Sequence, residues 1–267
     1  MSRDFSLNKY KELCQTAINS GYALLTVKAY LTMRDLPAKF IIFRHDIDRK
    51  PENAVRMAVM EKELGIKSTY YFRFNKTVFQ PNLIRIIANM GHEIGYHYET
   101  LDKAKGDYEK AIKTFKSELD EFRKIAEVNT ICMHGNVLTK WGNRDLWSKY
   151  DFNDFGLIGE AYLSINNATY LSDTGRTWGT RYKIKDWLPT NIHDDDKTVK
   201  NTEVNRTDDL IELLKKGNLE RTYLLVHPNR WNDNFSDWVI ALVFDMATNL
   251  VKRLFNLRKY SLENIAR

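Results

Sequence analysis

The chain has 267 residues and carries 41 Lys and Arg against 35 Asp and Glu, which gives a formal net charge of +6. Apolar residues make up 43% and charged residues 28%, and these fractions exclude an intrinsically disordered chain. With 12 Gly and 5 Pro the chain is not collagenous, and its two cysteines, Cys14 and Cys132, cannot form a disulfide framework. We therefore expect a globular protein from a reducing compartment.

Strand-like and helix-like segments alternate along the first half of the chain. Pro51 begins one of the helical segments and Gly65 follows its end, as is common for helices. In chain order the expected elements are a strand at 40–43, a helix at 51–64, a strand at 68–74, a helix at 82–90, a strand at 92–97, a helix at 102–125 and a strand at 129–133. Strands that are separated by helices predict parallel βα units.

The second half of the chain shows fewer regular elements. An irregular stretch at 141–202 is followed by a helix at 207–216, a strand at 223–226 and a last helix from about 236. The spacing suits a barrel better than an open nucleotide-binding sheet, because no Gly-rich phosphate loop follows the early strands. We expect a single domain over 1–267, with an N-terminal helical extension (about 1–35) and a C-terminal closing helix (about 236–258) whose apolar positions pack over the barrel.

Histidine and aspartate side chains gather where the predicted strands end. In a parallel βα barrel the active site lies at the carboxyl ends of the strands. Four of the six histidines stand at or just beyond such ends, and a pair of aspartates stands beside the first of them. These residues are His45, Asp46, Asp48, His97, His134 and His227. Histidines scattered at random would not do this, so the pattern predicts a functional site.

Asp46 and Asp48 lie two residues apart, so their carboxylates share one face if the chain is extended there. Two carboxylates this close must share a cation or separate their pKa values. One of them can therefore bind a metal ion while the other remains a general base. The alternative is an Asp-rich turn with Asp48 near the cap of the helix at Pro51, and this accounts for one aspartate but not for the histidines.

Three motifs between about Phe40 and Trp231 resemble those of the polysaccharide deacetylase (NodB-homology) family. RHDID (44–48) is similar to the first family motif, GHEIGYH (91–97) to the second and LLVH (224–227) to the last. GHEIGYH is the most specific of the three. The resemblance implies a distorted (β/α)7 barrel that removes N- or O-acyl groups from sugars with the help of a divalent metal.

The same resemblance implies roles for two residues of the first motif and for one residue of each of the other two motifs. Asp46 is expected to be the general base and Asp48 a metal ligand. His97 is expected to be a second metal ligand, and His227 the general acid. These residue types suit the chemistry, since Zn²⁺ accepts histidine nitrogen and aspartate oxygen and lowers the pKa of bound water. A histidine near neutral pKa is suited to protonating a leaving amine.

The chain departs from the family pattern at two places. The second motif usually ends in a further histidine, where this chain has Leu101, which cannot bind a metal. The third motif usually offers Arg-Pro-Pro, where this chain has the residues MHGN (133–136). We expect that His134 completes the metal site or replaces the arginine that orients the base, and Glu99 is the other candidate ligand.

Five residues are candidates for binding the substrate, namely Arg44, Glu99, Asp173, Trp178 and Trp231. Arg44 either orients a carboxylate of the first motif or packs in the core. Residues 173–178 occupy the place of the family's Asp/Trp fourth motif, so Asp173 is expected to tune a histidine. Trp178 is either a sugar-stacking wall or loop packing, and Trp231 is either pocket wall or barrel lid.

Three further residues are weaker candidates for the site. His92 begins its strand and is therefore expected at the opposite end of the barrel, in a structural role. His193 precedes three aspartates, which is typical of a solvated acidic turn. A nucleophilic role for Cys132 has little support from its surroundings in the sequence.

The whole pattern, with HPNRW (227–231) and a closing helix, resembles a WbmS-type branch associated with bacterial lipopolysaccharide O-antigen biosynthesis. This predicts a metal-dependent hydrolase of C–N bonds other than peptide bonds, with Zn²⁺ the expected ion. Its substrate would be a nucleotide-, lipid- or glycan-linked amidosugar that carries an acetyl or formyl group. The alternative is a catalytically degenerate barrel that binds sugar without hydrolysing it, because Leu101 removes a standard ligand.

The distribution of charge bears on location and partners. The start of the chain does not resemble a signal peptide and no apolar stretch is long enough to span a membrane, so we expect a cytoplasmic protein. Residues 252–267 carry five cations and one anion. Because the site is a cluster of Asp and His and not a basic patch, no nucleic-acid partner is expected. The basic tail predicts a helix end with weak peripheral contact to anionic membrane.

Overall fold

The computed structural model describes residues 3–136, 139–179, 182 and 204–265, so the predicted acidic turn at His193 lies outside the described residues. The strands are β1 (Ala23–Leu25), β2 (Phe40–Ile47), β3 (Thr69–Arg73), β4 (Glu93–Tyr98), β5 (Thr130–Met133), β6 (Gly159–Glu160), β7 (Thr169–Ser172) and β8 (Arg221–Val226). They form one sheet in the order β6-β5-β4-β3-β2-β8-β7, with β1 paired to β2 off this path, and every pairing is parallel.

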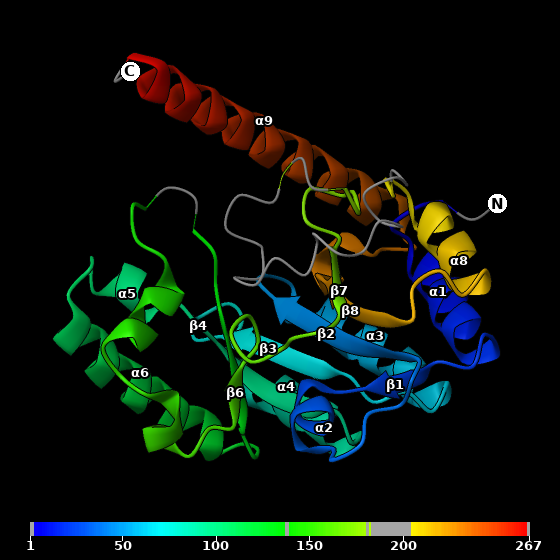
Figure 1. The fold of residues 1–267 in the computed structure, drawn as a ribbon, viewed down its shortest axis with the longest axis horizontal. Helices are drawn as coiled ribbons and strands as arrows, with labels where there is room; N and C mark the ends of the chain where they lie inside the picture. Colours follow the sequence, from blue (N-terminus) through cyan, green and yellow to red (C-terminus); the bar gives the residue numbers. More distant parts are fainter. Residues whose placement is uncertain (1–2, 137–138, 180–181, 183–203, 266–267) are drawn as a thin grey trace.

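The sheet is curled but not closed. Within the described part of the chain, the two edge strands β6 and β7 do not pair with each other (Figure 1). The expected distorted (β/α)7 barrel is therefore confirmed, in an open form. Strand β2 lies inside the sheet, between β3 and β8, and is buried along its whole length, as expected for a parallel strand with both faces covered.

The helices are α1 (Leu7–Asn19), α2 (Val27–Thr32), α3 (Pro51–Glu63), α4 (Pro81–Asn89), α5 (Thr100–Lys103), α6 (Tyr108–Arg123), α8 (Thr207–Lys215) and α9 (Phe235–Ile265), with short 3-10 turns η1 (Asn143–Ser148), η2 (Phe152–Phe155) and η4 (Pro228–Arg230). The single helix expected at 102–125 is in fact two. Gly106 has a φ of +88°, which ends α5, and the side chain of Asp107 accepts a hydrogen bond from the backbone of Lys110 to begin α6.

Three short strands were not predicted. β1 lies within the N-terminal region that was expected to be only helical, and it pairs with the first half of β2. β6 and β7 lie in the stretch that was expected to be irregular. Strands of two to four residues carry too few side chains for a periodic pattern, so only their pairing partners define them.

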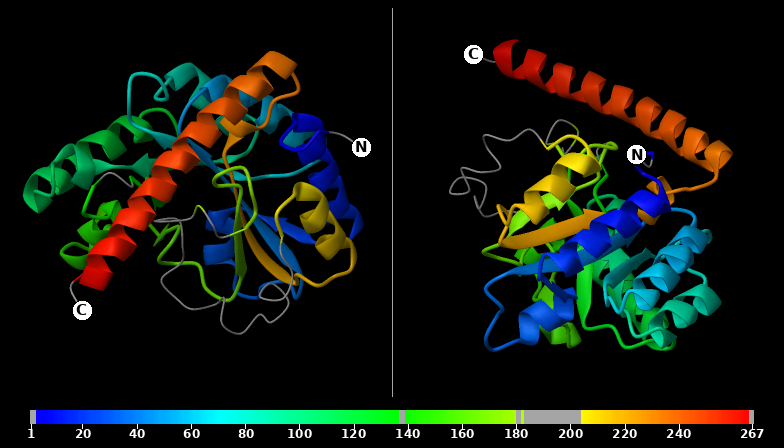
Figure 2. Two further views of the ribbon diagram at one scale, coloured as in Figure 1. Left: turned by 90° about the horizontal axis from the view of Figure 1, so that it is seen from above. Right: turned by 90° about the vertical axis from the view of Figure 1, so that its right-hand side faces the viewer.

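Helix α9 crosses above the sheet, over the end where the strands finish (Figure 2). The expectation that its apolar side packs over the barrel is wrong. Val243 is 60% exposed and Leu250 59% exposed, whereas Asp245 is only 3% exposed. The polar side faces inward because cations lie beneath it, with Asp245 at 3.8 Å from Arg176 and 3.5 Å from Arg230. None of the helices in the described ranges is both long and apolar enough to cross a membrane.

A fully buried polar cluster lies on the side of β2 that faces α3. Side chains alternate along a strand, so His45 points away from its neighbours Arg44 and Asp46. Its Nε2 lies 2.7 Å from Oε1 of Glu61. The hydroxyls of Tyr10 and Tyr70 donate to the same carboxylate at 2.5 and 2.6 Å. His45 is therefore part of the packing between α1, β2 and α3, away from the other strand-end histidines.

His92 belongs to the edge of this cluster. Its Nε2 donates to the carbonyl oxygen of Ala58 at 3.1 Å, and its Nδ1 accepts from the backbone of Ser68 at 3.2 Å. Both ring nitrogens are thus used within the fold, and burial lowers the pKa of the ring. These contacts agree with the structural role expected for His92.

We expect Glu61→Gln to lower the free energy of unfolding by about 3 kcal/mol. Burial alone would raise the pKa of Glu61, but His45, His92 and the Tyr10 hydroxyl together lower it to about 2. The ionised carboxylate therefore stabilises the fold above the pKa of an unfolded glutamate, about 4.3, and this contribution is lost as the pH falls toward 2.

Urea unfolding of wild type and Glu61→Gln, from about pH 7 to about pH 3, measures this difference. The gap between the two proteins should shrink as the pH falls. Glu63→Gln, an exposed change on the same helix, is the control and should match wild type throughout. A gap that stays constant with pH would contradict a role for the ionised carboxylate.

Candidate metal centre and active site

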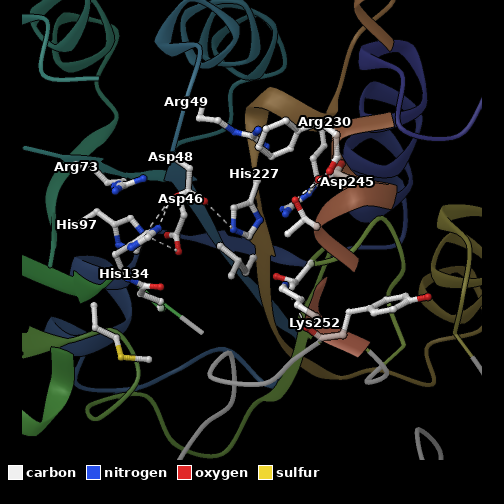
Figure 3. Close-up of a pocket in the computed structure, with 18 of the residues that line it drawn as sticks. Asp46, Asp48, Arg49, Arg73, His97, His134, His227, Arg230, Asp245 and Lys252 are labelled. Atoms are coloured by element: carbon white, nitrogen blue, oxygen red, sulfur yellow. Dashed lines mark hydrogen bonds and ion pairs between the residues drawn. The ribbon is translucent and has the colours of Figure 1, made fainter. Parts of the chain in front are cut away.

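A cavity of about 410 Å³ opens where β2, β3, β4, β5 and β8 end, and α9 forms part of its wall (Figure 3). Five predicted site residues line it, namely Asp46, Asp48, His97, His134 and His227. They come from four strands or from the residues just after them, so the parallel sheet brings together side chains that are far apart in the sequence. This is the end of the barrel at which the site was expected.

Asp48, His97 and His134 each direct one ligand atom to a common point, and these atoms all lie within 4.8 Å of one another. Oδ1 of Asp48 lies 3.5 Å from Nε2 of His97 and 3.5 Å from Nε2 of His134. Ligand atoms around a tetrahedral ion at about 2.1 Å are themselves about 3.4 Å apart. Oδ1 of Asp48 is also buried and has no hydrogen-bond partner among the described residues. The set therefore fits a divalent metal ion.

Neighbouring groups hold the ring of His97 and the backbone of His134. Nδ1 of His97 donates to the carbonyl oxygen of Cys132 at 3.1 Å, which leaves Nε2 without a proton and facing Asp48. His134 is anchored through its backbone N–H, which donates to the carbonyl oxygen of Tyr98 at 2.8 Å. Its Nδ1 lies 3.6 Å from Oε2 of Glu99. Both rings thus present Nε2 to the carboxylate.

Glu99 lies behind His134 and is engaged elsewhere. Arg73 donates to its Oε2 at 2.5 Å, and the ammonium group of Lys103 lies 3.7 Å from its Oε1. Leu101, at the family's usual ligand position, is fully buried in the apolar core. Of the two candidates for the third ligand, the geometry favours His134 and gives Glu99 a supporting place.

The electrostatic surroundings keep Asp48 and His134 in the protonation states that a metal requires. Burial, with the charge of Arg73, lowers the pKa of His134 to about 4, so the ring is neutral at pH 7. Burial alone would raise the pKa of Asp48, but the imidazoles of His134, His97 and His227 hold it well below the usual range. A neutral imidazole and an ionised carboxylate are the forms that bind Zn²⁺.

Asp46 is held by a buried arginine. Arg44 donates from Nε to Oδ1 of Asp46 at 2.8 Å and from Nη2 to Oδ2 at 2.6 Å. Arg44 also donates to the hydroxyl of Tyr223 at 3.0 Å, so the guanidinium is fixed on both sides. Such a two-point contact sets the direction of the carboxylate as well as its charge. Arg44 therefore orients Asp46, which was one of its two expected roles, and it does not line the cavity.

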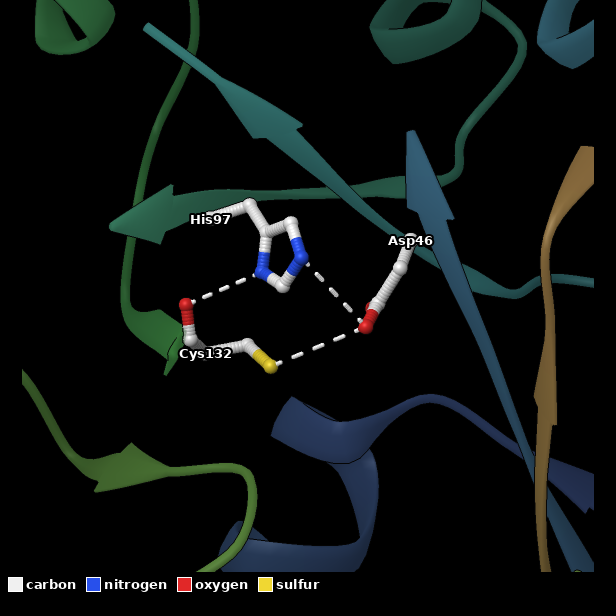
Figure 4. Close-up of side chains that lie close together, drawn as sticks. All are labelled: Asp46, His97 and Cys132. Carbon is white, nitrogen blue, oxygen red and sulfur yellow. Dashed lines mark hydrogen bonds and ion pairs between the residues drawn. The ribbon is translucent and has the colours of Figure 1, made fainter. Parts of the chain in front are cut away.

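A second group of ligand-type atoms comprises Asp46, His97 and Cys132 (Figure 4). Sγ of Cys132 lies 4.0 Å from Oδ2 of Asp46, but it is only 2.6 Å from Nη2 of Arg44. A cation placed there would face the guanidinium at close range, so this group does not suit a metal ion. Cys132 is buried and does not line the cavity, so its thiol is not placed to attack a substrate there.

His227 is oriented by Asp173. Nδ1 of His227 donates to Oδ1 of Asp173 at 2.6 Å, and the backbone N–H of His227 donates to Oδ2 at 2.9 Å. Arg230 and Trp231 donate to the same carboxylate at 2.9 and 2.8 Å. Nε2 of His227 then faces the cavity, 3.8 Å from Oδ2 of Asp48. Burial alone would raise the pKa of Asp173, but Arg230 and His227 lower it, so the carboxylate stays charged.

The five predicted substrate-binding residues do not line the cavity and lie behind those that do. They are Arg44, Glu99, Asp173, Trp178 and Trp231. Trp178 is 1% exposed and donates to the hydroxyl of Thr207 at 3.1 Å, so its prediction as a sugar-stacking wall is wrong. The indole rings of Trp178 and Trp231 both bury their large apolar surface in the core. Asp173 does contact a histidine, since it accepts hydrogen bonds from the ring and the backbone of His227.

Several lining residues were missed by sequence reasoning, and one of them could have been found. Arg73 ends β3, so the strand-end argument that selected His97 applies to it equally. Arg49 directly follows Asp48, and Arg230 lies in the turn after His227. Phe244 carries no local signal, because it reaches the cavity only through the path of α9.

No family model matches the chain, and no curated protein matches it. Among solved structures, the CE4 family pseudoenzyme BA3943 of Bacillus anthracis is 12% identical, with a TM-score of 0.44 over 80% of this chain, and the chain covers 61% of its length. The Bc1960 peptidoglycan N-acetylglucosamine deacetylase is 16% identical, with a TM-score of 0.41 over 79% of this chain and 82% of its own. PdaA of Bacillus subtilis, a family 4 carbohydrate esterase, is 13% identical, with a TM-score of 0.40 over 88% of this chain and 82% of its own. Similarities at this level carry no argument about what the cavity does.

Proposed function

We propose that this protein is a metal-dependent hydrolase that removes an acetyl or formyl group from an amidosugar. The observation that carries the proposal is the orphaned Oδ1 of Asp48, with Nε2 of His97 and Nε2 of His134 each 3.5 Å from it. An acid–base pair, Asp46 and His227, lines the same cavity. A structural cluster would satisfy its buried oxygen internally, whereas a ligand set leaves it directed at an absent partner.

Five residues that line the cavity each have a part in the proposed reaction. Asp48, His97 and His134 would hold a divalent ion such as Zn²⁺, which supplies an electrophile for the acyl oxygen when bound. Asp46, oriented by Arg44, accepts a proton from the attacking water. His227, held by Asp173, donates a proton from Nε2 to the leaving nitrogen. Water is thereby added across the C–N bond, and the products are a carboxylic acid and an amine.

The setting of the reaction is a further part of the proposal. The resemblance to the WbmS-type branch supports a role in bacterial surface polysaccharide or O-antigen biosynthesis, in the cytoplasm. The substrate would be an amidosugar linked to a nucleotide, a lipid or a glycan. The alternative of a barrel that binds sugar without hydrolysing it predicts neither a bound metal nor acyl release.

Release of acetate or formate from amidosugars by the purified chain tests this function. Zn²⁺ should support the release, and a chelator should abolish it until the ion is restored. The protein as purified should contain about one metal ion per chain. No metal at the site, together with no release in the presence of added divalent ions, would contradict hydrolysis and leave the sugar-binding alternative.

We also propose that helix α9 makes weak peripheral contact with a membrane. Four apolar residues on one side of this helix are about 60% exposed, namely Ile240, Val243, Met246 and Leu250. A basic segment follows these apolar residues, since residues 252–267 hold five cations and one anion. An exposed apolar stripe beside a basic segment suits the surface of an anionic membrane, where lipid-linked sugars are found.

Sedimentation with vesicles tests this contact. We expect more protein to bind vesicles of phosphatidylglycerol and phosphatidylcholine than vesicles of phosphatidylcholine alone, and less at high salt. Val243→Asp with Leu250→Asp should lower binding by about 10-fold or more, because two exposed apolar side chains no longer enter the interface. Val59→Asp, an exposed change on α3, should have no effect. Equal binding to both vesicle types would contradict the contact.

A further inference from the structure

Three arginines line the cavity on one side of the candidate metal centre. They are Arg49 in the connection after β2, Arg73 at the end of β3 and Arg230 in η4. Figure 3 shows them in an arc beside Asp48 and His227. Positive charge is thus concentrated next to the proposed reaction centre.

Two of these arginines already have anionic partners. Arg230 lies 2.9 Å from Oδ1 of Asp173 and 3.5 Å from Oδ1 of Asp245. Arg73 lies 2.5 Å from Oε2 of Glu99. Arg49, in contrast, has no hydrogen bond or ion pair with any residue in the described part of the chain. Among the described residues, Arg49 is thus the arginine of the arc without a direct anionic contact, and Asp245 and Asp48 act on its charge only from a distance.

The side chain of Arg49 is nevertheless held in place. Its guanidinium carbon lies 3.6 Å from the centre of the Phe244 ring, and the residue is half-buried. Stacking on an aromatic ring uses the face of the guanidinium and leaves the N–H groups at its edge free to donate. An arginine kept in position with unused donors is suited to a planar or tetrahedral oxyanion.

We propose that Arg49, with Arg73 and Arg230 beside it, binds an oxyanion of the substrate, so that the protein acts on acidic amidosugars. This inference rests on the proposed hydrolase and narrows its substrate. The oxyanion is a phosphate, as in nucleotide- and lipid-linked sugars, or a carboxylate of a sugar acid. Both accept two parallel hydrogen bonds from a guanidinium. A neutral glycan offers only hydroxyl groups and would leave the charge of Arg49 unpaired in the cavity.

Calorimetric titration of the purified full-length chain with inorganic phosphate and with acetate tests the subsite at constant ionic strength. Arg49→Gln should weaken binding of the preferred anion by about 10-fold or more. Arg49→Lys, which keeps the charge but loses the planar donor edge, should fall between Arg49→Gln and wild type. Arg85→Gln, an exposed change on α4, is the matched control and should bind as wild type does. Any contact between the anion and a bound metal ion is the same in all these proteins, so it does not affect the comparison of their anion affinities.

The outcomes separate the sources of the oxyanion and the two proposals. Loss of phosphate binding in Arg49→Gln supports a phosphorylated sugar, and loss of acetate binding alone supports a sugar acid. If Arg49→Gln and Arg85→Gln bind both anions equally well, the subsite is overturned. Binding that depends on Arg49 without any acyl release would refute the hydrolase and keep the subsite. Release from neutral amidosugars, with no effect of Arg49→Gln on KM, would keep the hydrolase and refute the subsite.

Discussion

Asp48→Ala and His134→Ala proteins are each expected to bind Zn²⁺ at least about 100-fold more weakly than the wild type, and to lose the metal during purification. Removing a neighbour that only supports a ligand commonly costs about 10- to 100-fold in affinity, so removing a ligand should cost at least as much. Elemental analysis of the purified proteins, followed by competition with a chelating dye, measures the change. His97→Ala should behave in the same way, because its Nε2 occupies the same side of Asp48.

Two control variants test whether this loss is specific. Asp46→Asn changes a carboxylate in the same cavity that is held by Arg44, and it should retain the metal. Glu99→Gln should retain it with an affinity lowered by about 10- to 100-fold at most, because Glu99 lies behind His134 and only supports it. Full metal content in His134→Ala would remove His134 from the ligand set. Loss in Glu99→Gln with retention in His134→Ala would transfer the role to Glu99.

Asp173→Asn is expected to lower kcat by about 100- to 10,000-fold with little change in KM or metal content. The change removes the charge that holds Nδ1 of His227, at 2.6 Å, and leaves the size of the side chain unchanged. His227→Gln should be impaired to a similar extent. Since the two residues act as a unit, the double variant should be little worse than either single one. Steady-state kinetics on the amidosugar that the wild type hydrolyses measures these effects.

The pH profile distinguishes a positioning role from a structural one. If His227 donates the proton, the wild type should show a decline in kcat at alkaline pH that is absent from His227→Gln. The position of this decline should change in Asp173→Asn, because the imidazole loses its carboxylate partner. Trp178→Phe serves as the control and should keep the wild-type profile and KM, since Trp178 is buried away from the cavity. An unshifted profile in Asp173→Asn, or additive losses in the double variant, would contradict the pairing.

Local sequence was sufficient to predict the direction of side chains that belong to a single strand. Asp46 and Asp48 are two residues apart at the end of β2, so their shared direction follows from the pleat of the strand. The same alternation places His45 on the opposite side, and applying it would have removed His45 from the strand-end cluster. His97 and His227 also follow from this reasoning, because each lies at or just after the end of a parallel strand.

The choice between His134 and Glu99 required the register of two strands. β4 and β5 pair with His97 opposite Cys132. His134 therefore follows its strand at the level of Glu99, and both are candidates from spacing alone. What separates them is Arg73, which binds Glu99 at 2.5 Å and comes from a third strand. Short-range patterns contain no information about such a partner.

The sequence by itself determined the parallel βα architecture and the end of the barrel at which Asp46, Asp48, His97 and His227 would meet. These features depend on periodicity and on the direction of strands, which neighbouring residues encode. Only the tertiary structure decided that Trp178 is core and that α9 turns Asp245 inward with Val243 outward. It also decided that Arg49 lies against Phe244, without an ion pair to any residue that the structure describes. Those outcomes depend on which distant charges and surfaces are brought into contact, because burial and ion pairing are properties of the packed chain.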